Sequence, residues 1–363
     1  MRFKTCKFKT ICGSLIAMAA TVRDDTIERP PSALLLMGAR AFRDLFDDSR
    51  LQRLNRLVRL PDPIRIDTVS TAAARARLAE TEYLLTGWGG PAIGEDLLTA
   101  APRLRAIIHT GGSVKHLVSP GLWERGIVVT SAAEANAIPV AEFTLATILL
   151  EAKRAPSYID GYARSRDMAG AWRDEIPPAV TFGGTVGIVG LSRVGRRVAE
   201  LLRPFDLEVI AADPYVDADS AASVGARLTD LDDLMAASDV VTIHAPALRE
   251  TRHLIDERRL RMLRPDAVLI NTARGSLVDT NALIARCRSG LLRAVLDVTD
   301  PEPLQADSPL FETPGIVLTP HIAGAMHAET RRLTDSALDD LEALIGGGVP
   351  RHAVDAASIG VSA

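Results

Sequence analysis

The sequence predicts an α/β protein made of two doubly wound domains, each built around a parallel sheet. Its 363 residues exceed what one ordinary hydrophobic core holds, which favours two domains. Short apolar runs recur along the chain, and helix-like segments separate them, as in successive βαβ units. A glycine-containing turn also joins an apolar run to a helix-like segment within residues 186–202.

A first series of apolar runs occupies the N-terminal part of the chain. Arginine-rich segments of helical character lie between these runs, so we expect them to form a first parallel sheet. The runs are SALLLMG (32–38), YLLTG (83–87), LRAIIHTGG (104–112) and GIVVTS (126–131).

A second series of apolar runs predicts the second sheet. Its members are TVGIVG (185–190), LEVIAAD (207–213), DVVTIHAP (239–246), AVLINTARG (267–275), LRAVLDV (292–298) and GIVLTPH (315–321). Between the two series, residues 140–172 have apolar residues at helical spacing and are expected to cross between the domains. A last amphipathic segment, 327–348, ends in three glycines that would stop a helix.

The composition is that of a soluble globular protein, with 47% hydrophobic and 24% charged residues. The formal net charge of −4 argues against nucleic acid or an anionic membrane as the main partner. The sequence has no unbroken apolar stretch of the roughly 18 residues needed to cross a bilayer. Its three cysteines form no CxxC pair, so we expect no disulfide framework and no metal site, and a reducing, cytoplasmic location.

Residues 1–30 imitate the charged and apolar regions of an export signal. Their apolar run is short, however, and Gly13 and Ser14 interrupt it. Three of the five lysines of the chain also fall within the first nine residues, whereas the rest of the sequence uses arginine almost throughout. We therefore expect a disordered N-terminal extension, and a functional export signal stays open as the alternative.

The turn Gly190-Leu191-Ser192-Arg193-Val194-Gly195 differs by one residue from the fingerprint of a dinucleotide-binding loop. The first glycine permits the tight turn and the third lets helix and strand pack closely, whereas Ser192 replaces the glycine that admits the pyrophosphate. Its hydroxyl is small and can donate to a phosphate oxygen. The helix N-terminus adds a partial positive charge, which Arg193 could reinforce. Taken alone, the loop is equally compatible with an ordinary tight turn.

Asp213 ends the apolar run that follows this turn. A carboxylate at that place accepts hydrogen bonds from the adenosine ribose and repels a 2′-phosphate, so it favours NAD over NADP. The alternative is a strand-end residue that opens the turn DPYVD.

Four further segments extend the pattern: WRDEIPPAVTFGGTVGIVGLSRVG (172–195), INTARGSLVDTNALI (270–284), AVLDVTDPEPL (294–304) and LTPHIAGA (318–325). With them the chain resembles the NAD-dependent D-isomer-specific 2-hydroxyacid dehydrogenases over well over half of its length. The resemblance implies a Rossmann-like NAD-binding domain, residues 140–324, inserted into a split substrate-binding domain, residues 31–139 and 325–363. It also implies a homodimer.

The resemblance assigns the chemistry to Arg274, Glu302 and His321. Reduction of a ketone requires a proton donor beside the oxygen, and imidazole suits this role near neutral pH. A carboxylate such as Glu302 fixes the tautomer of the ring and favours its protonated form, and a guanidinium grips a planar carboxylate with two parallel bonds. Each residue alone also has an ordinary structural interpretation, but all three follow strands of one α/β unit, where ligands bind.

The same resemblance places further residues around the ligands. Asp297 approaches the nicotinamide carboxamide, the adenosine loop includes His244, Ala245, Pro246 and Thr251, the ribose lies near Thr272 and Ala273, and His321 and Gly324 complete the cofactor set. Backbone amides of Gly112 and Ser113 match those that hold the substrate carboxylate. Here the chain reads GGSVKH where the family often has GVGYDN, so Lys115 replaces an acidic residue and favours a second anionic group on the substrate. Trp88 either covers the substrate or packs between the domains.

These features predict an oxidoreductase that transfers a hydride between NAD(H) and a D-2-hydroxy acid/2-keto acid pair, with a small-molecule partner and neither nucleic acid nor membrane. Two alternatives stay open. One is a specialised glyoxylate/hydroxypyruvate reductase or phosphoglycerate dehydrogenase-like enzyme. The other is an NAD-sensing corepressor-like scaffold, which has the same fold and cofactor and can keep the three catalytic residues.

Overall fold

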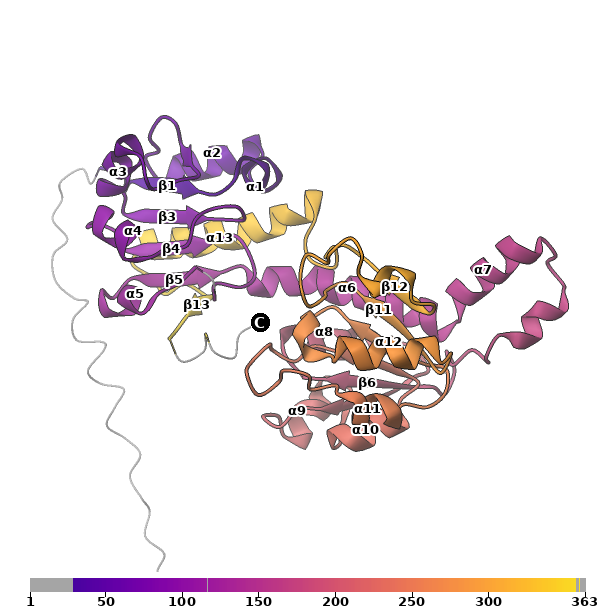
Figure 1. Cartoon of the computed structure of the whole chain (residues 1–363). Helices are drawn as coiled ribbons and strands as arrows, with labels where there is room; N and C mark the ends of the chain where they lie inside the picture. The colour runs from indigo at the N-terminus through magenta and orange to yellow at the C-terminus, as the bar shows by residue number, and fades with distance from the viewer. Residues whose placement is uncertain (1–28, 116, 357–358, 360–363) are drawn as a thin grey trace, which may run out of the picture.

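The computed structural model describes residues 29–115, 117–356 and 359, and shows two lobes joined by one long helix (Figure 1). Residues 1–28, which hold most of the expected N-terminal extension, lie outside the described part of the chain. We call the lobe that contains strands β1–β5 and β13 the N-terminal lobe, and the lobe that contains β6–β12 the central lobe. Each lobe has one sheet with helices on both faces, which confirms the predicted fold class.

The sheet of the N-terminal lobe has the order β13-β5-β4-β3-β1-β2. Its strands are β1 (Ala33–Leu36), β2 (Arg65–Ile66), β3 (Tyr83–Thr86), β4 (Ala106–His109), β5 (Val128–Ser131) and β13 (Ala353–Val354). All pair in parallel except β13, which is antiparallel to β5. The four predicted runs all form strands, and β1 to β5 follow the doubly wound order 2-1-3-4-5.

Helices cover both faces of this sheet. They are α1 (Ala39–Leu45), α2 (Asp48–Leu57), α3 (Ala72–Ala79), α4 (Glu95–Ala100) and α5 (Pro120–Glu124), and α13 (Thr330–Ile345) returns from the C-terminal part of the chain. Leu333, Leu338 and Leu341 of α13 are buried in the same core as Leu35 of β1. The helix ends at the predicted glycines, where Gly347 takes the left-handed φ of +73° that stops a helix.

The sheet of the central lobe is parallel throughout, in the order β12-β11-β10-β9-β6-β7-β8. Its strands are β6 (Thr185–Val189), β7 (Glu208–Ala212), β8 (Arg227–Leu228), β9 (Val240–Ile243), β10 (Ala267–Asn271), β11 (Leu292–Leu296) and β12 (Ile316–Leu318). Helices α8 (Arg193–Leu202), α9 (Ala218–Ser223), α10 (Leu231–Ala237), α11 (Glu257–Met262) and α12 (Thr280–Arg288) flank it. Strands buried on both faces explain why these runs are continuously apolar. The order is that of a Rossmann fold with one added strand.

Helix α6 (Ala133–Ala152) joins the lobes and packs against α13 in one and α8 in the other. It begins at Ala133 rather than at residue 140, and it ends where Arg154 takes a φ of +61°, so the predicted continuous segment 140–172 is broken. By length and composition, α6 is the one described helix that could span a membrane, and it packs against helices of both lobes.

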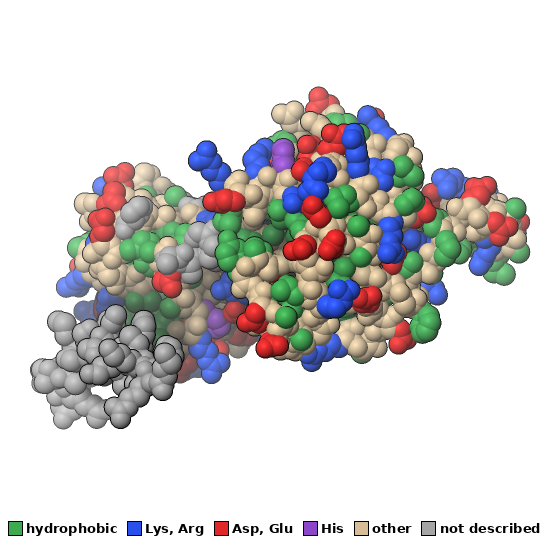
Figure 2. Space-filling model, turned by 90° about the horizontal axis from the view of Figure 1, so that it is seen from below, with side chains coloured by type: hydrophobic (Ala, Val, Ile, Leu, Met, Phe, Trp, Pro, Cys, Tyr) green, Lys and Arg blue, Asp and Glu red, His purple; other side chains and the backbone are tan. Residues whose placement is uncertain are grey.

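Beyond Arg154 the chain projects away from the central lobe as an arm (Figure 1). We define the arm as residues 155–182, which include α7 (Ala155–Ser165) and the short 3-10 helix η1 (Ala171–Glu175). The space-filling view shows the arm standing clear of the rest of the molecule (Figure 2).

Candidate active site

A cleft of about 1000 Å³ lies between the two lobes. Residues at the carboxyl ends of the parallel strands line it, which is where ligands bind in open α/β sheets. The N-terminal lobe contributes Gly38, Arg40, Trp88, Gly112, Ser113 and Lys115, among others. The central lobe contributes Ser192, Arg193, Val194, His244, Thr272, Ala273, Arg274, Asp297, His321 and Gly324. Of the predicted cofactor residues, Gly190, Gly195, Asp213, Ala245, Pro246 and Thr251 lie outside this lining.

The turn between β6 and α8 keeps glycine where the geometry demands it. Gly190 has a φ of +91°, and a Cβ there would lie 2.7 Å from the backbone nitrogen of Ala245. A Cβ on Gly195 would lie 2.0 Å from the carbonyl oxygen of Gly190. Ser192 instead has an ordinary φ of −64° as the N-cap of α8, and its side chain makes no capping hydrogen bond. The serine therefore occupies a fingerprint position where the backbone conformation does not require glycine.

Asp213 follows β7 and closes this turn. Its carboxylate accepts hydrogen bonds from the backbone N–H of Leu191 at 2.8 Å and of Tyr215 at 2.9 Å. Both oxygens keep a further acceptor site, so the residue can still receive ribose hydroxyls. Arg193 lines the cleft, but its Nε donates to Glu134 in the first turn of α6 at 2.5 Å, a partner that the sequence did not indicate.

The loop after β9 has one buried imidazole. The ring of His244 meets the hydroxyl of Thr242 at 3.0 Å, and burial lowers the pKa of His244 to about 3, so it is neutral at physiological pH. Thr251 donates to the carbonyl of Pro246 at 2.7 Å and accepts from the N–H of Leu248 at 2.8 Å. Thr251 therefore shapes the loop rather than facing the cleft.

His321 and Glu302 come together at the ends of β12 and β11. Nδ1 of His321 lies 2.5 Å from Oε1 of Glu302, and both side chains are partly exposed. This contact fixes one ring nitrogen and leaves Nε2 for the cleft, which His321 lines. His321 also has a φ of +55°, an uncommon conformation for a residue with a Cβ, and its N–H donates to the carbonyls of Asp297 and Thr319 at 3.1 and 3.0 Å.

The carboxylate of Asp297, which is only 2% exposed, holds the turn that carries His321. It accepts from the hydroxyl of Thr319 at 2.6 Å and from the N–H groups of Ile322 and Ala323 at 2.8 and 2.9 Å. Three donors on a buried carboxylate make this a rigid support. The residue lines the cleft as predicted, and it also has this positioning role, which the sequence did not reveal.

Arg274 is held at the end of β10 through its backbone. The side chain of Asn271 donates to the carbonyl of Arg274 at 2.8 Å and accepts from the N–H of Ala273 at 3.0 Å. A Cβ on Gly275 would lie 2.0 Å from the carbonyl carbon of Thr299, so the following residue must be glycine. The guanidinium uses Nη1 for the carbonyl of Ala273 at 2.6 Å, and the side chain lines the cleft.

The N-terminal lobe supplies the side of the cleft opposite the central lobe, which we call the N-terminal lip. Trp88 lines the cleft and is 42% exposed, and Gly112 and Ser113 follow β4. Nζ of Lys115 reaches across to the carbonyl of Ala247 in the central lobe at 3.5 Å. Burial, together with the nearby guanidinium of Arg274, holds the pKa of Lys115 below its usual range.

Asn136 is a site residue that the sequence analysis missed. It lies in the first turns of α6 and accepts from the N–H of Ala325 at 3.0 Å, and a Cβ built on Gly112 or on Gly324 would lie 3.3 Å from its amide group. It thus holds the loop of Gly324 and Ala325 to α6, close to the loop of Gly112. A polar residue within the apolar helical run 133–152 was the available signal, but its loop partners lie far away in the sequence.

A glycine cradle on a Rossmann sheet, facing a histidine–carboxylate pair and an arginine, defines a two-domain dinucleotide-binding protein. Residues 146–323 match the family described as D-isomer specific 2-hydroxyacid dehydrogenase, NAD binding domain. The chain is 35% identical over 291 residues to a glyoxylate reductase of Aeropyrum pernix, which covers 78% of this chain and 85% of the relative. The chain belongs to the D-isomer specific 2-hydroxyacid dehydrogenase family, and its central lobe is the NAD-binding domain.

Other similarities agree with this family. A D-3-phosphoglycerate dehydrogenase of Mycobacterium leprae is 38% identical over 278 residues, covering 76% of this chain and 51% of the relative, so the chain spans about half the length of that protein. The solved structure of the TT0316 protein from Thermus thermophilus has a TM-score of 0.71 and 30% identity, and covers 89% of this chain and 100% of that one. A 2-hydroxyacid dehydrogenase from Ketogulonicigenium vulgare has a TM-score of 0.71 and 25% identity, covering 92% and 100%.

The cradle geometry generates a paired prediction. Gly195→Ala should weaken NADH binding about a hundredfold or more, because its methyl group collides with backbone, whereas Ser192→Gly should change the affinity by less than about tenfold. Calorimetric titration with NADH measures both. Gly94→Ala is the matched control, since a Cβ there meets nothing within 4 Å. Equal affinities for the Gly195→Ala variant and the parent would refute this account of the loop.

The support of the histidine turn generates another prediction. Asp297→Asn replaces one acceptor oxygen by a donor that faces a backbone N–H, and leaving a buried partner unsatisfied costs about 1–3 kcal/mol. We expect a lower melting temperature and, if the chain reduces keto acids as proposed below, a fall of about tenfold or more in kcat/KM for that reaction. Asp307→Asn, at an exposed position, is the control. A variant with unchanged melting and unchanged kcat/KM would show that the turn does not depend on Asp297.

Proposed function

We propose that this protein is an NAD-dependent oxidoreductase that transfers a hydride between NAD(H) and a D-2-hydroxy acid/2-keto acid pair. The observation that carries the proposal is the 2.5 Å contact between His321 and Glu302 on the cleft that also contains Arg274 and the glycine turn. Relatives named glyoxylate reductase and D-3-phosphoglycerate dehydrogenase support the same reaction class.

The residues of the cleft fit a bound NAD. Ser192, Arg193 and Val194 of the glycine turn line the cleft, the first residues of α8 offer free N–H groups there, and Asp213 has acceptor sites left for the ribose. When bound, the nicotinamide supplies or accepts the hydride at the substrate carbon. The negative charge of Asp213 opposes a 2′-phosphate and favours NADH over NADPH.

The side chains of this protein bind the substrate, transfer the proton and hold the proton donor in position. Arg274 binds the C1 carboxylate through two parallel hydrogen bonds and polarises the adjacent carbonyl. His321 donates a proton from Nε2 to the carbonyl oxygen as it gains charge, and in the reverse direction it accepts the hydroxyl proton. Glu302 stabilises the protonated ring through Nδ1, and Asp297 keeps the ring in place through the backbone.

A reduction screen tests the proposal directly. The purified protein is given NADH with a panel of 2-keto acids that includes glyoxylate, hydroxypyruvate and phosphonooxypyruvate, and the best substrate is repeated with NADPH. We expect turnover with NADH and a lower kcat/KM with NADPH. Absence of turnover with the whole panel would overturn the enzyme proposal and favour the NAD-sensing scaffold.

The acid–base pair predicts losses of turnover that spare cofactor binding. His321→Gln removes the positioned proton donor, so it should lower turnover by about two to four powers of ten and leave NADH affinity nearly unchanged. Glu302→Gln keeps a partner of similar size at Nδ1 of His321 but removes the carboxylate, so it should lower turnover by a smaller factor. Steady-state kinetics and calorimetric titration with NADH measure both effects. A Glu302→Gln variant with the turnover of the parent would show that the two residues do not act as a pair.

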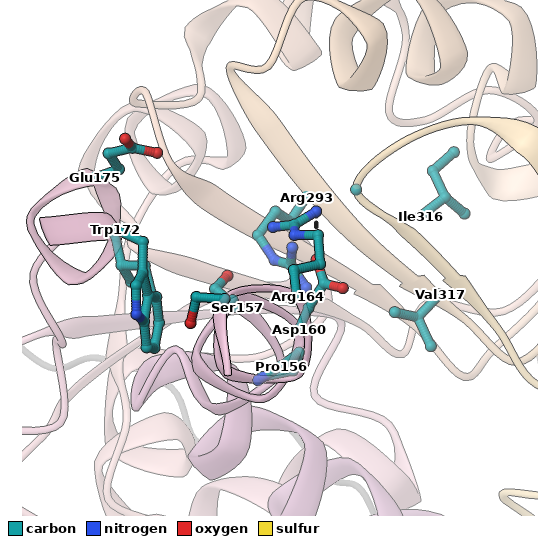
Figure 3. A pocket seen from close by; sticks show the side chains of 13 residues that line it. Pro156, Ser157, Asp160, Arg164, Trp172, Glu175, Arg293, Ile316 and Val317 are labelled. Carbon is teal, nitrogen blue, oxygen red and sulfur yellow. Dashed lines mark ion pairs between the residues drawn. The ribbon is translucent and has the colours of Figure 1, made fainter. Parts of the chain in front are cut away.

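We infer further that the protein is a homodimer assembled through the arm. Exposed apolar side chains gather on the arm and beside it, namely Leu150, Ile159, Tyr162, Met168 and Phe182. A groove of about 740 Å³ separates the arm from the sheet edge, with Pro156, Ser157 and Trp172 on one side and Ile316 and Val317 of β12 on the other (Figure 3). In the proposed dimer, the apolar arms of two copies pack against each other beside these grooves, related by a two-fold axis.

The arm generates a prediction about mass in solution. The parent chain should have about twice the monomer mass of 38.9 kDa by light scattering, and the double variant Ile159→Glu/Met168→Glu should approach one monomer mass, because charges on an apolar contact are costly to bury. Val349→Glu, at a position that is 86% exposed outside the arm, should remain dimeric. A monomeric parent, or a dimeric double variant, would contradict assembly through the arm.

We also propose a cytoplasmic location and a small-molecule substrate rather than a nucleic-acid or membrane partner. NAD(H) is available in the cytoplasm, and the net charge of −4 gives no attraction for polyanions. The face drawn in Figure 2 also offers no basic patch for a polyanion, because basic and acidic side chains are interspersed over it. Cell fractionation of the native protein tests the location.

A further inference from the structure

Two cationic side chains, Lys115 and Arg274, line the cleft from opposite lobes. We call the part of the cleft between them its substrate end. Lys115 follows β4 in the N-terminal lobe, and Arg274 follows β10 in the central lobe. Both line the same cavity, and the guanidinium is near enough to disfavour the charged ammonium. Like charges brought together in a partly buried site are unfavourable unless an anion joins them.

Neither cation has a carboxylate partner within the described part of the chain. Lys115 reaches only the carbonyl of Ala247, at the long distance of 3.5 Å, and Arg274 uses one nitrogen for the carbonyl of Ala273. The acids around the cleft have other partners: Asp297 accepts from three donors, Glu302 contacts His321, Glu134 pairs with Arg193, and Asp44 pairs with Arg40. The substrate end therefore carries two uncompensated positive charges.

One substrate carboxylate does not require both cations. A carboxylate has about four acceptor sites. Two parallel N–H bonds from Arg274 and the backbone amides of Gly112 and Ser113 would occupy them. The ammonium of Lys115 is then surplus to that group. The other cation on this side of the cleft, Arg40, lies 3.8 Å from the carboxylate of Asp44, whereas Lys115 has no carboxylate partner among the described residues.

We propose that the substrate carries a second anionic group at the end remote from its C1 carboxylate, and that Lys115 binds this group. The proposal rests on the oxidoreductase function given above. The substrate class is a D-2-hydroxy acid or 2-keto acid with a terminal carboxylate, sulfonate or phosphate. Lys115 belongs to one lobe and Arg274 to the other, so a dianion bridges the two lobes and favours the closed cleft.

A matched pair of substrates isolates the second charge. 2-Oxoglutarate and 2-oxoglutaramate have the same length, but the second has a neutral amide in place of the terminal carboxylate. The parent should prefer the dianion in kcat/KM with NADH. Lys115→Met should lower kcat/KM for the dianion by about tenfold to a hundredfold, the worth of a hydrogen bond to a charged group, and change the value for the amide by less than about threefold.

Two further variants sharpen the test. Lys115→Arg keeps the charge and should restore much of the preference for the dianion. Lys153→Met removes the other lysine of the described part of the chain, at an exposed position after α6, and should leave both substrates unaffected. Sulfopyruvate and phosphonooxypyruvate, run beside oxaloacetate, distinguish a terminal sulfonate or phosphate from a carboxylate.

The result that overturns the proposal is an equal loss on both members of the pair in Lys115→Met. Such a loss would show that Lys115 acts on the C1 carboxylate or on the contact between the lobes. A parent that binds the amide as tightly as the dianion would also overturn it. Calorimetric affinities of the pair for the NAD⁺-loaded protein give this answer even without turnover, so failure of the oxidoreductase proposal is distinguished from failure of the dianion proposal.

Discussion

The constraint on which the site depends is that parallel strands place all their carboxyl ends at one edge of a sheet. The glycine turn follows β6, and Arg274, Asp297 and His321 follow or adjoin β10, β11 and β12, so residues far apart in the sequence converge without any special folding of the loops. The N-terminal lobe obeys the same rule, and the loops after β3 and β4 supply its lip. The strand ends of the N-terminal lobe and those of the central lobe face each other across the cleft. Each lobe therefore contacts a ligand from one side only.

Polar side chains then hold these loops in place. The buried side chains of Asp297 and Asn271 support the turn of His321 and the backbone of Arg274, and the half-buried Asn136 holds the loop of Ala325 to α6. All three satisfy backbone groups and so act on the chemistry through position rather than by contact with the reacting atoms. Asn136 lies on α6, the helix that both lobes share, which makes the relative placement of the lobes part of the site.

Local patterns predicted the strands of both sheets and the ligand-facing ends of those strands, because continuous apolar runs and glycine turns are properties of neighbouring residues. They did not predict β2, β8 or β13, which have two residues each and exist only through pairing with distant strands. They also did not predict the ion pair between Arg193 and Glu134 or the three donors on Asp297. Such partners are set by the tertiary fold, and a single sequence contains no local signal for them.

The charges in and around the cleft suit the ligands proposed above. Asp213 lies behind the glycine turn, outside the lining of the cleft, whereas the N-terminus of α8 offers a partial positive charge on the lining itself. Lys115 and Arg274 add cationic side chains from the two lobes. His244 also lines the cleft, but it adds no charge because burial lowers its pKa to about 3. In the proposed complex the ribose would lie at Asp213 and the pyrophosphate at α8, so the charges of Lys115 and Arg274 would remain for the anionic substrate.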